Sequence, residues 1–484
     1  MRYDVIVIGG GVIGAMVLRA LSRYRLSICM AERENDPARG ASGANSGIVH
    51  AGFDAATGSV KAEMNRLGSL RMEQVARELG VPYRRNGSMV VGYSEEDKER
   101  LRELYDRGRA NGIEALSLIS GEEARRLESS LSEQVSCALR AESGAIISPY
   151  ALTIAAIGNA MDNGAELVGG YEVTAIKRTV DGFRLIDRSG RELCARYLVN
   201  CAGLYADAIA SIVGDHSFTI RPRAGEYLLL DRKCGAMLGH TIFTVPTPKG
   251  KGILISPTAD GNLLLGPTAE ERADKEDTAT TEGGLARVME AARRMVPDLD
   301  LRATITSFTG LRAASSTGDF IISASDSGMI HCAGIESPGL SSAPAIADRV
   351  IELLMQSGLS LCEKDDYNPY RAPIHRLAHL SEEEKNALIA SDPAYGRIVC
   401  RCEQISEGEI LDALRRNPRA TDLDGVKRRV RAGMGRCQGA FCSPSVMEML
   451  ARELGIPMEA VTKAGEGSCL CKGRTKEEYD DGDA

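Results

Sequence analysis

The chain begins with a short apolar run that ends in a glycine-rich turn. Residues 3–8 are followed by Gly9-Gly10-Gly11-Val12-Ile13-Gly14 and then by an apolar segment to about residue 24. An apolar run, a glycine turn and a longer apolar segment predict strand, turn and helix. Residues 26–31 supply a second strand, so the first 32 residues are predicted to form a βαβ unit.

The glycines of this turn have the spacing of a nucleotide-binding motif. Gly9, Gly11 and Gly14 form the G-x-G-x-x-G pattern, which lets backbone N–H groups approach a pyrophosphate at a helix N-terminus. Glu32 ends the second strand, where a carboxylate binds ribose hydroxyls and disfavours a 2′-phosphate. The pattern predicts a dinucleotide site. A glycine turn without a ligand is the alternative, and the motif alone does not separate FAD from NAD.

Length and charge narrow the class of protein. A chain of 484 residues with 43% hydrophobic residues is long enough for two or three domains. The net charge of -8 gives no electrostatic support for nucleic-acid binding. No signal peptide and no membrane-spanning apolar run is recognisable in the sequence. We therefore expect a cytoplasmic protein, with peripheral membrane association left open.

Three later segments resemble a known superfamily. Residues 40–52, Gly-Ala-Ser-Gly-Ala-Asn-Ser-Gly-Ile-Val-His-Ala-Gly, resemble the flavin-contacting loop of the D-amino-acid oxidase-like superfamily, especially its L-2-hydroxyglutarate and glycerol-3-phosphate dehydrogenase branches. Residues 200–203 and 332–340 resemble that superfamily's two later FAD-binding stretches. The resemblance covers about residues 1–360 and implies FAD. With the glycine turn, the predicted cofactor-binding residues are Gly9, Gly11, Gly14, Glu32, Ser42, Asn45, Ser46, Gly47, Ile48, Val173, Ala202, Gly203, Gly334, Gly339 and Leu340.

The predicted fold is α/β, with a Rossmann-like FAD-binding domain interrupted by a substrate domain. Alternating apolar stretches and prolines over residues 227–268 indicate an antiparallel sheet in an α+β substrate domain, and residues 73–131 have helical spacing. The predicted ranges are 1–75, 140–215 and 315–360 for the FAD-binding domain, 76–139 and 216–314 for the substrate domain, 361–395 for a connector, 396–462 for a small helical domain and 463–484 for a tail.

Oxidation of an alcohol needs a base for the hydroxyl proton and cations for an anionic substrate. His50 is the candidate base, because it lies in the flavin loop and imidazole titrates in the useful range. The alternative is a histidine that only hydrogen-bonds the loop or the flavin. Arg223 and Arg312 each lie near a glycine and a predicted strand end, where a guanidinium can hold a carboxylate or phosphate with two hydrogen bonds, although surface arginines are common. Tyr227 and Lys251 are weaker candidates.

One feature departs from the respiratory glycerol-3-phosphate dehydrogenases. These enzymes resemble one another in an arginine shortly after the glycine that follows the loop histidine. The present chain has Gly52-Phe53-Asp54 there. The departure weakens the transfer of their substrate specificity.

Four cysteines near the C-terminus have metal-ligand spacing. Cys400 and Cys402 form a C-x-C pair, and Cys437 and Cys442 form a C-x4-C pair. Four thiolates complete a [2Fe-2S] cluster or a tetrahedral zinc site. The spacing and the preceding residues 433–436 closely resemble the bacterioferritin-associated ferredoxin-like domain, which implies iron and sulfide.

Helix-capping residues and basic residues lie near these cysteines in the sequence. Ser406 and Glu409 predict a capping box, and Pro444 suits the first turn of a following helix. Basic residues lie nearby, and they indicate either a solvated face or a partner surface: Lys427, Arg428, Arg429, Arg431 and Arg436. Cys469 and Cys471 form a second C-x-C without a matching pair, and we interpret them as incidental thiols.

The flavin-binding body and the cysteine module together resemble the catalytic subunit of the anaerobic type of glycerol-3-phosphate dehydrogenase. The resemblance implies oxidation of glycerol 3-phosphate by hydride transfer to FAD, with electrons leaving through the cluster to a protein acceptor, another flavoprotein subunit of a hetero-oligomer. A cluster has no use in an enzyme that passes electrons directly to oxygen. Two alternatives stay open: an L-2-hydroxyglutarate or other 2-hydroxyacid dehydrogenase, and an electron-transfer subunit without a substrate of its own.

Overall fold

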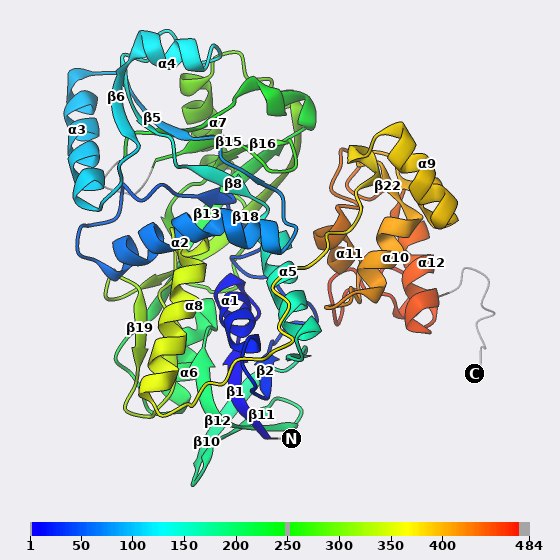
Figure 1. Ribbon diagram of the computed structural model, residues 1–484. Helices are drawn as coiled ribbons and strands as arrows, with labels where there is room; N and C mark the ends of the chain where they lie inside the picture. Colours follow the sequence, from blue (N-terminus) through cyan, green and yellow to red (C-terminus); the bar gives the residue numbers. More distant parts are fainter. Residues whose placement is uncertain (1, 247–251, 474–484) are drawn as a thin grey trace, which may run out of the picture. The chain divides into compact units, whose positions relative to one another are not determined.

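The computed structural model describes residues 2–246 and 252–473. The chain divides into two compact units, Met1–Pro373 and Ile374–Ala484. Figure 1 labels their helices and many of their strands. Within the described ranges, no helix is long and apolar enough to cross a membrane.

The first unit contains an eight-stranded sheet with the order β10-β11-β12-β1-β2-β9, extended by β20 beside β12 and by β19 beside β20. The pairs β1–β2, β1–β12, β2–β9 and β12–β20 are parallel, so these strands end at one edge of the sheet. The strands are β1 (Arg2–Ile8), β2 (Ile28–Ala31), β9 (Glu166–Val168), β10 (Val173–Thr179), β11 (Gly182–Asp187), β12 (Glu192–Asn200), β19 (Ile321–Ala324) and β20 (Ile330–Ala333).

Helices cover both faces of this sheet because successive strand side chains alternate between them. Val5 and Val7 enter a core with α1 (Val12–Ser22), α5 (Pro149–Asp162) and α8 (Gly339–Gln356). Ile6 and Ile8 enter the opposite core with α6 (Ala206–Ile212). The helix α1 packs between α5 and α8, and α2 (Val60–Glu78) lies against α8 (Figure 1).

A second sheet of nine strands forms the other half of this unit, with the order β17-β13-β16-β15-β14-β5-β7-β6 and β18 beside β13. All its pairs are antiparallel except β14–β5. Its strands are β5 (Ser88–Gly92), β6 (Leu116–Ser120), β7 (Cys137–Ala141), β13 (Ile220–Leu230), β14 (Thr241–Thr244), β15 (Leu254–Pro257), β16 (Leu263–Gly266), β17 (Glu270–Glu271) and β18 (Thr304–Ser315). The helices of this half are α3 (Glu95–Ala110), α4 (Gly121–Leu127) and α7 (Glu282–Met295). A small third sheet joins β3 (Ile48–Val49), β4 (Tyr83–Arg84) and β8 (Ala145–Ile147).

These sheets confirm the predicted α/β class with an interrupting antiparallel sheet. The first sheet takes its strands from residues 2–31, 166–200 and 321–333, and the second from 88–141 and 220–315. The helical spacing over residues 73–131 did not predict β5 and β6, because these strands are short and lie between charged helices. The domain boundaries within residues 1–360 stay a prediction.

The second unit is the small helical module expected around the cysteines. Its elements are α9 (Glu382–Ser391), β21 (Ile398–Cys400), β22 (Ile405–Ser406), α10 (Glu407–Arg415), α11 (Leu423–Val430) and α12 (Ser443–Leu454). The capping box of Ser406 and Glu409 is confirmed at the start of α10, as is Pro444 in the first turn of α12. Ile410, Leu414 and Leu450 lie in its core.

A buried polar network joins the two parallel strands β12 and β20. The Asn200 amide donates from Nδ2 to Ala206 O at 2.8 Å and accepts at Oδ1 from Ala202 N at 3.2 Å. These backbone partners fix the amide orientation, so Nδ2 also faces His331 Nδ1 as a donor, at 3.1 Å. His331 is therefore the tautomer that is protonated at Nε2, which contacts Asp215 Oδ2 at 3.1 Å.

We predict that this network makes stability depend on pH. Burial lowers the pKa of His331, so the folded state binds this proton less readily than the unfolded state. Stability from this group is present above an unfolded pKa of about 6.5 and is lost as pH falls below it, by up to about 1.4 kcal/mol per pH unit. Urea unfolding of wild type and His331→Gln, followed by circular dichroism at about pH 7.5 and about pH 5.5, should show the larger loss in wild type. Equal losses in the two proteins would contradict this assignment.

Candidate functional site

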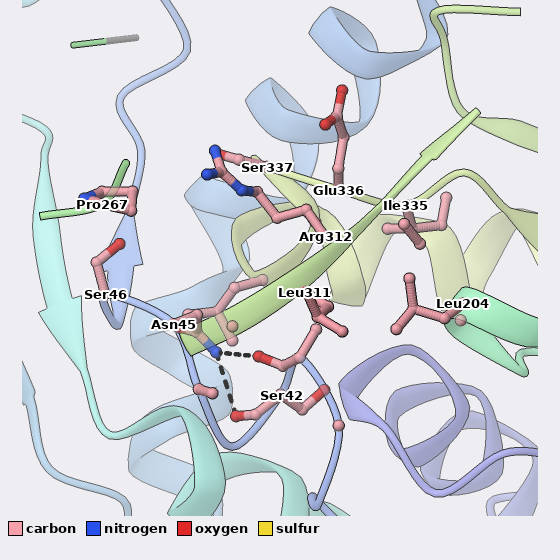
Figure 2. Close-up of a pocket in the computed structure, with 18 of the residues that line it drawn as sticks. Ser42, Asn45, Ser46, Leu204, Pro267, Leu311, Arg312, Ile335, Glu336 and Ser337 are labelled. Carbon is pink, nitrogen blue, oxygen red and sulfur yellow. Dashed lines mark hydrogen bonds between the residues drawn. The ribbon is translucent and has the colours of Figure 1, made fainter. Parts of the chain in front are cut away.

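A cavity of about 1200 Å³ lies in the first unit, at the carboxyl ends of β1, β2, β12 and β20. Its wall also includes residues of β13, β18, the loop over residues 40–50 and the start of α8. In the view of Figure 2, Ser42 and Asn45 lie toward one end of the group drawn, and Arg312, Glu336 and Ser337 toward the other. The cavity therefore connects the predicted nucleotide-binding turn with the predicted substrate-binding residues.

The glycine turn leaves room at the N-terminus of α1 because side chains are excluded from it. A Cβ at Gly9, where φ is +108°, would lie 2.4 Å from Cys201 O, and a Cβ at Gly14 would lie 2.1 Å from Gly9 O. Gly9 and Gly11 line the cavity, whereas Gly14 serves the packing of helix on strand. This cradle of backbone N–H groups fits a dinucleotide pyrophosphate.

Glu32 follows β2 at the cavity wall, as the spacing predicted. Its carboxylate accepts from the N–H groups of Gly10 and Glu34. Burial raises the pKa of this carboxyl group. The two N–H donors hold the carboxylate at the end of the strand, where it fits the ribose of a bound dinucleotide.

The loop after β2 is braced by its own side chains. Asn45 donates from Nδ2 to Ala41 O at 2.9 Å and Ser42 O at 3.1 Å, and accepts at Oδ1 from Gly47 N at 2.8 Å (Figure 2). Ser42 Oγ accepts from Val12 N at 2.8 Å, which ties the loop to the start of α1. The residues of this loop that line the cavity include Ser42, Asn45, Ser46, Ile48 and His50.

The remaining predicted cofactor residues separate into two groups. Val173, Ala202, Gly203, Gly339 and Leu340 line the cavity. Two glycines instead allow close backbone packing beside it: Gly47, whose Cβ would lie 2.5 Å from Ile147 O, and Gly334, whose Cβ would lie 2.4 Å from Ser315 Cβ.

Three of the five predicted catalytic residues line the cavity together: His50, Tyr227 and Arg312. His50 Nε2 lies 3.3 Å from Ser337 Oγ, and the His50 N–H donates to Ser341 Oγ at 2.8 Å. The Tyr227 ring stacks on Phe308 with centroids 4.9 Å apart, and burial raises the pKa of its hydroxyl. Lys251 lies outside the described residues.

Arg312 is held by backbone carbonyls rather than by a carboxylate. Its Nη2 donates to Thr268 O and, at 3.3 Å, to Ala224 O. Its Nε is buried and has no hydrogen-bond partner among the described residues. The guanidinium thus retains its positive charge at the cavity wall, and only Nη2 of its three nitrogens is hydrogen-bonded within the described residues, which suits an anionic group.

Arg223 is the cross-strand neighbour of Arg312 but has a different environment. The two residues are paired between β13 and β18, yet Arg223 is 36% exposed and contacts Glu336 Oε2 at 3.5 Å. Glu336 also pairs with Lys61 Nζ at 3.0 Å. The cavity wall includes Glu336 but not Arg223 or Lys61. Sequence reasoning did not predict the roles of Glu336 and Ser337, although both lie in the segment recognised after β20; nothing in the sequence marked Lys61.

The four predicted ligand cysteines form two close pairs in the second unit, although no three metal-ligating side chains among the described residues are close enough together to bind a single metal ion. Cys402 Sγ lies 3.5 Å from Cys437 Sγ, and the side chains of Cys400 and Cys442 are hydrogen-bonded to each other. The hydrogen bond from Cys442, with those from the N–H groups of Gly433 and Glu403, lowers the pKa of Cys400 despite its burial. Two pairs of sulfurs suit a [2Fe-2S] cluster, in which each iron takes two protein ligands. Cys471 packs against the hydrophobic core of the module, and Cys469 forms an isolated β-bridge with Thr462.

Known proteins resemble both units. The model of the FAD dependent oxidoreductase family matches residues 4–353, and that of the BFD-like [2Fe-2S] binding domain matches residues 398–452. The chain is 45% identical to a glycerol 3-phosphate dehydrogenase from Caloramator mitchellensis, over 98% of this chain and 99% of that one. An L-2-hydroxyglutarate dehydrogenase from Escherichia coli is 31% identical over 55% of this chain and 64% of its own length.

A solved structure supports the same assignment. The FAD-bound L-alpha-glycerophosphate oxidase from Mycoplasma pneumoniae, in its dithionite-reduced form, has a TM-score of 0.73 and 31% identity, covering 77% of this chain and 98% of its own. The cradle of glycines, the braced loop and the paired cysteines fit the two cofactors that these matches imply, FAD and a [2Fe-2S] cluster. The chain therefore belongs to the FAD dependent oxidoreductase family and adds to it a C-terminal BFD-like [2Fe-2S] binding domain.

Proposed function

We propose that the chain is a dehydrogenase that oxidises sn-glycerol 3-phosphate to dihydroxyacetone phosphate and passes the electrons to a protein acceptor. The observation that carries this proposal is the 45% identity with a glycerol 3-phosphate dehydrogenase along nearly the whole of both chains, including the cysteine module. FAD supplies an acceptor for the hydride, and the cluster carries single electrons. The acceptor protein, which we take to be another flavoprotein subunit, is part of the proposal.

The residues at the substrate end of the cavity support this chemistry. Arg312 holds the phosphate of the substrate, because it lines the cavity and no ion pair within the described residues neutralises its charge. His50 Nε2 takes the proton of the C2 hydroxyl, once this hydroxyl replaces Ser337 Oγ as the hydrogen-bond donor to the single lone pair of the nitrogen. Tyr227 closes the wall beside Arg312.

L-2-Hydroxyglutarate is the second candidate substrate. The 31% identity with an L-2-hydroxyglutarate dehydrogenase over 55% of this chain favours it, and a guanidinium binds a carboxylate as well as a phosphate. The absence of an arginine from Gly52-Phe53-Asp54 weakens the transfer of substrate specificity from the respiratory glycerol-3-phosphate dehydrogenases.

Anaerobic mixing separates the two substrates. The purified protein should lose its flavin absorbance with sn-glycerol 3-phosphate and keep it with L-2-hydroxyglutarate at the same concentration, because only a substrate reduces FAD without a partner. Stopped-flow absorbance measures both reactions, with glycerol as a control that lacks the phosphate. Bleaching by L-2-hydroxyglutarate alone would reject the proposed substrate, and bleaching by neither would favour an electron-transfer subunit.

His50→Ala should slow anaerobic flavin reduction by about 10²-fold or more, the scale of losing a general base. FAD content should be retained, because the contacts of His50 with Ser341 and Ser69 use its backbone. The matched control is His216→Ala, which removes an exposed histidine outside the cavity. Flavin reduction at the wild-type rate in His50→Ala would assign His50 a structural role.

Arg312→Met should weaken substrate binding by roughly 10-fold to 100-fold, the loss expected for a hydrogen bond to a charged group. The dissociation constant is taken from the substrate dependence of flavin reduction. Arg221→Met is the control, since Arg221 lies exposed on the neighbouring strand. An unchanged dissociation constant in Arg312→Met, with FAD still bound, would remove Arg312 from the substrate site.

A further inference from the structure

The four cluster ligands differ in their access to solvent. Cys400 and Cys442 are 1% and 3% exposed and lie in the hydrophobic core of the second unit. Cys402 is exposed and Cys437 is partly exposed. A cluster held by these four sulfurs has one side in the core and the other, carried by Cys402 and Cys437, at the surface of the module.

A large aromatic side chain lies exposed beside the outer pair. Phe441 is 85% exposed, although it stands in the short loop between two ligands. It directly precedes Cys442 and follows Cys437 by four residues, so the loop that carries it begins at one ligand and ends at another. Exposed aromatic residues mark protein interfaces, because they bury large apolar area at little entropic cost.

Within the two segments that carry the ligands, residues 398–404 and 433–445, the exposed charged residues are arginines. Arg401 and Arg436 directly precede Cys402 and Cys437, and both are exposed. Residues 398–404 and 433–445 contain a single carboxylate, Glu403. It is 3% exposed and bound by Arg431 Nε at 2.8 Å. The surface at the outer pair is thus apolar at Phe441 and positive at its two arginines, which complements an acidic partner.

We propose that Arg401, Arg436 and Phe441 form the docking surface for an acidic one-electron carrier protein, the flavoprotein acceptor of the proposed function, which takes its electron from the side of the cluster carried by Cys402 and Cys437. This inference rests on the proposed function, in which the cluster delivers electrons to a protein. In each transfer one electron leaves the reduced cluster, which becomes oxidised, and reduces one centre in the carrier. Phe441 supplies apolar contact, and the two arginines supply attraction and orientation.

The test uses the full holoenzyme, reduced anaerobically with a stoichiometric amount of dithionite, so that it does not depend on the substrate. Two haem proteins serve as probes: cytochrome b5, which is acidic, and cytochrome c, which is basic. Stopped-flow absorbance follows haem reduction at low and high ionic strength, where the screening length falls from about 30 Å at 0.01 M to about 10 Å at 0.1 M. Wild type should reduce cytochrome b5 faster than cytochrome c at low ionic strength, and salt should slow the cytochrome b5 reaction.

The double variant Arg401→Glu/Arg436→Glu should slow cytochrome b5 reduction by at least about tenfold at low ionic strength and accelerate cytochrome c reduction. Phe441→Ser should slow the cytochrome b5 reaction at both ionic strengths. The charge control is Arg452→Glu on α12, roughly 15 Å along the helix from Cys442 at 1.5 Å per residue. The apolar control is Leu470→Ser, at a residue that is 50% exposed and distant in sequence from the ligands. Both controls should behave as wild type, and the cluster absorbance of every variant establishes that its cluster is assembled.

Four outcomes would overturn the proposal. Wild-type rates that are no higher with cytochrome b5 than with cytochrome c would reject an acidic partner. Equal effects of Arg452→Glu and of the double variant would reject the assigned surface. Slower transfer from flavin to cluster with unchanged cytochrome reduction would assign the surface to the chain's own FAD-binding region. A dimer that Phe441→Ser converts to a monomer, again with unchanged cytochrome reduction, would assign it to a second copy of the chain. Failure of sn-glycerol 3-phosphate to bleach the flavin would refute the proposed function without affecting these measurements.

Discussion

The close contact between the glycine turn after β1 and the end of β12 is the constraint on which the cofactor site depends. Gly9 lies so near the Cys201 carbonyl that any side chain there would collide with backbone, which does not move aside cheaply. Gly14 allows α1 to sit equally close to the turn. This packing brings the N-terminus of α1 to the edge where the parallel strands end, so the N–H groups face a cavity instead of side chains.

A buried hydrogen-bond network on the α6 side of the first sheet supports the same edge, where the parallel strands end. Asn200 holds the Ala202 backbone at the cavity wall, and its amide, which its backbone partners orient, donates to His331 Nδ1. Buried amides of this kind are costly unless every group is paired, so the network specifies one arrangement of the strand ends. The cofactor wall is therefore supported by polar contacts that do not themselves reach the cavity.

At the substrate end, ion pairing distinguishes two arginines that the sequence presents as equivalent. Arg223 and Arg312 are direct neighbours across two strands, but Glu336 neutralises the first, while backbone carbonyls hold the second. Carbonyls orient a guanidinium without cancelling its charge. In the second unit, burial makes a comparable distinction among four cysteines, since the core covers one pair and leaves the other at the surface.

Local patterns in the sequence determined the parts of this protein that depend on neighbouring residues. The βαβ unit, the position of Glu32 and the capping box of α10 follow from short-range spacing, because strand, turn and helix geometry fix where such residues lie. Local patterns did not predict β5 and β6, since these strands are short and their neighbours are charged helices. Tertiary structure alone decided which side chains meet. Glu336 contacts Arg223, which is more than 100 residues away in sequence, and Lys61, which is more than 250 residues away. Contacts over such separations arise from the packing of whole elements. The register of β13 on β18 places the two arginines side by side, and the sequence of neither strand determines that register by itself.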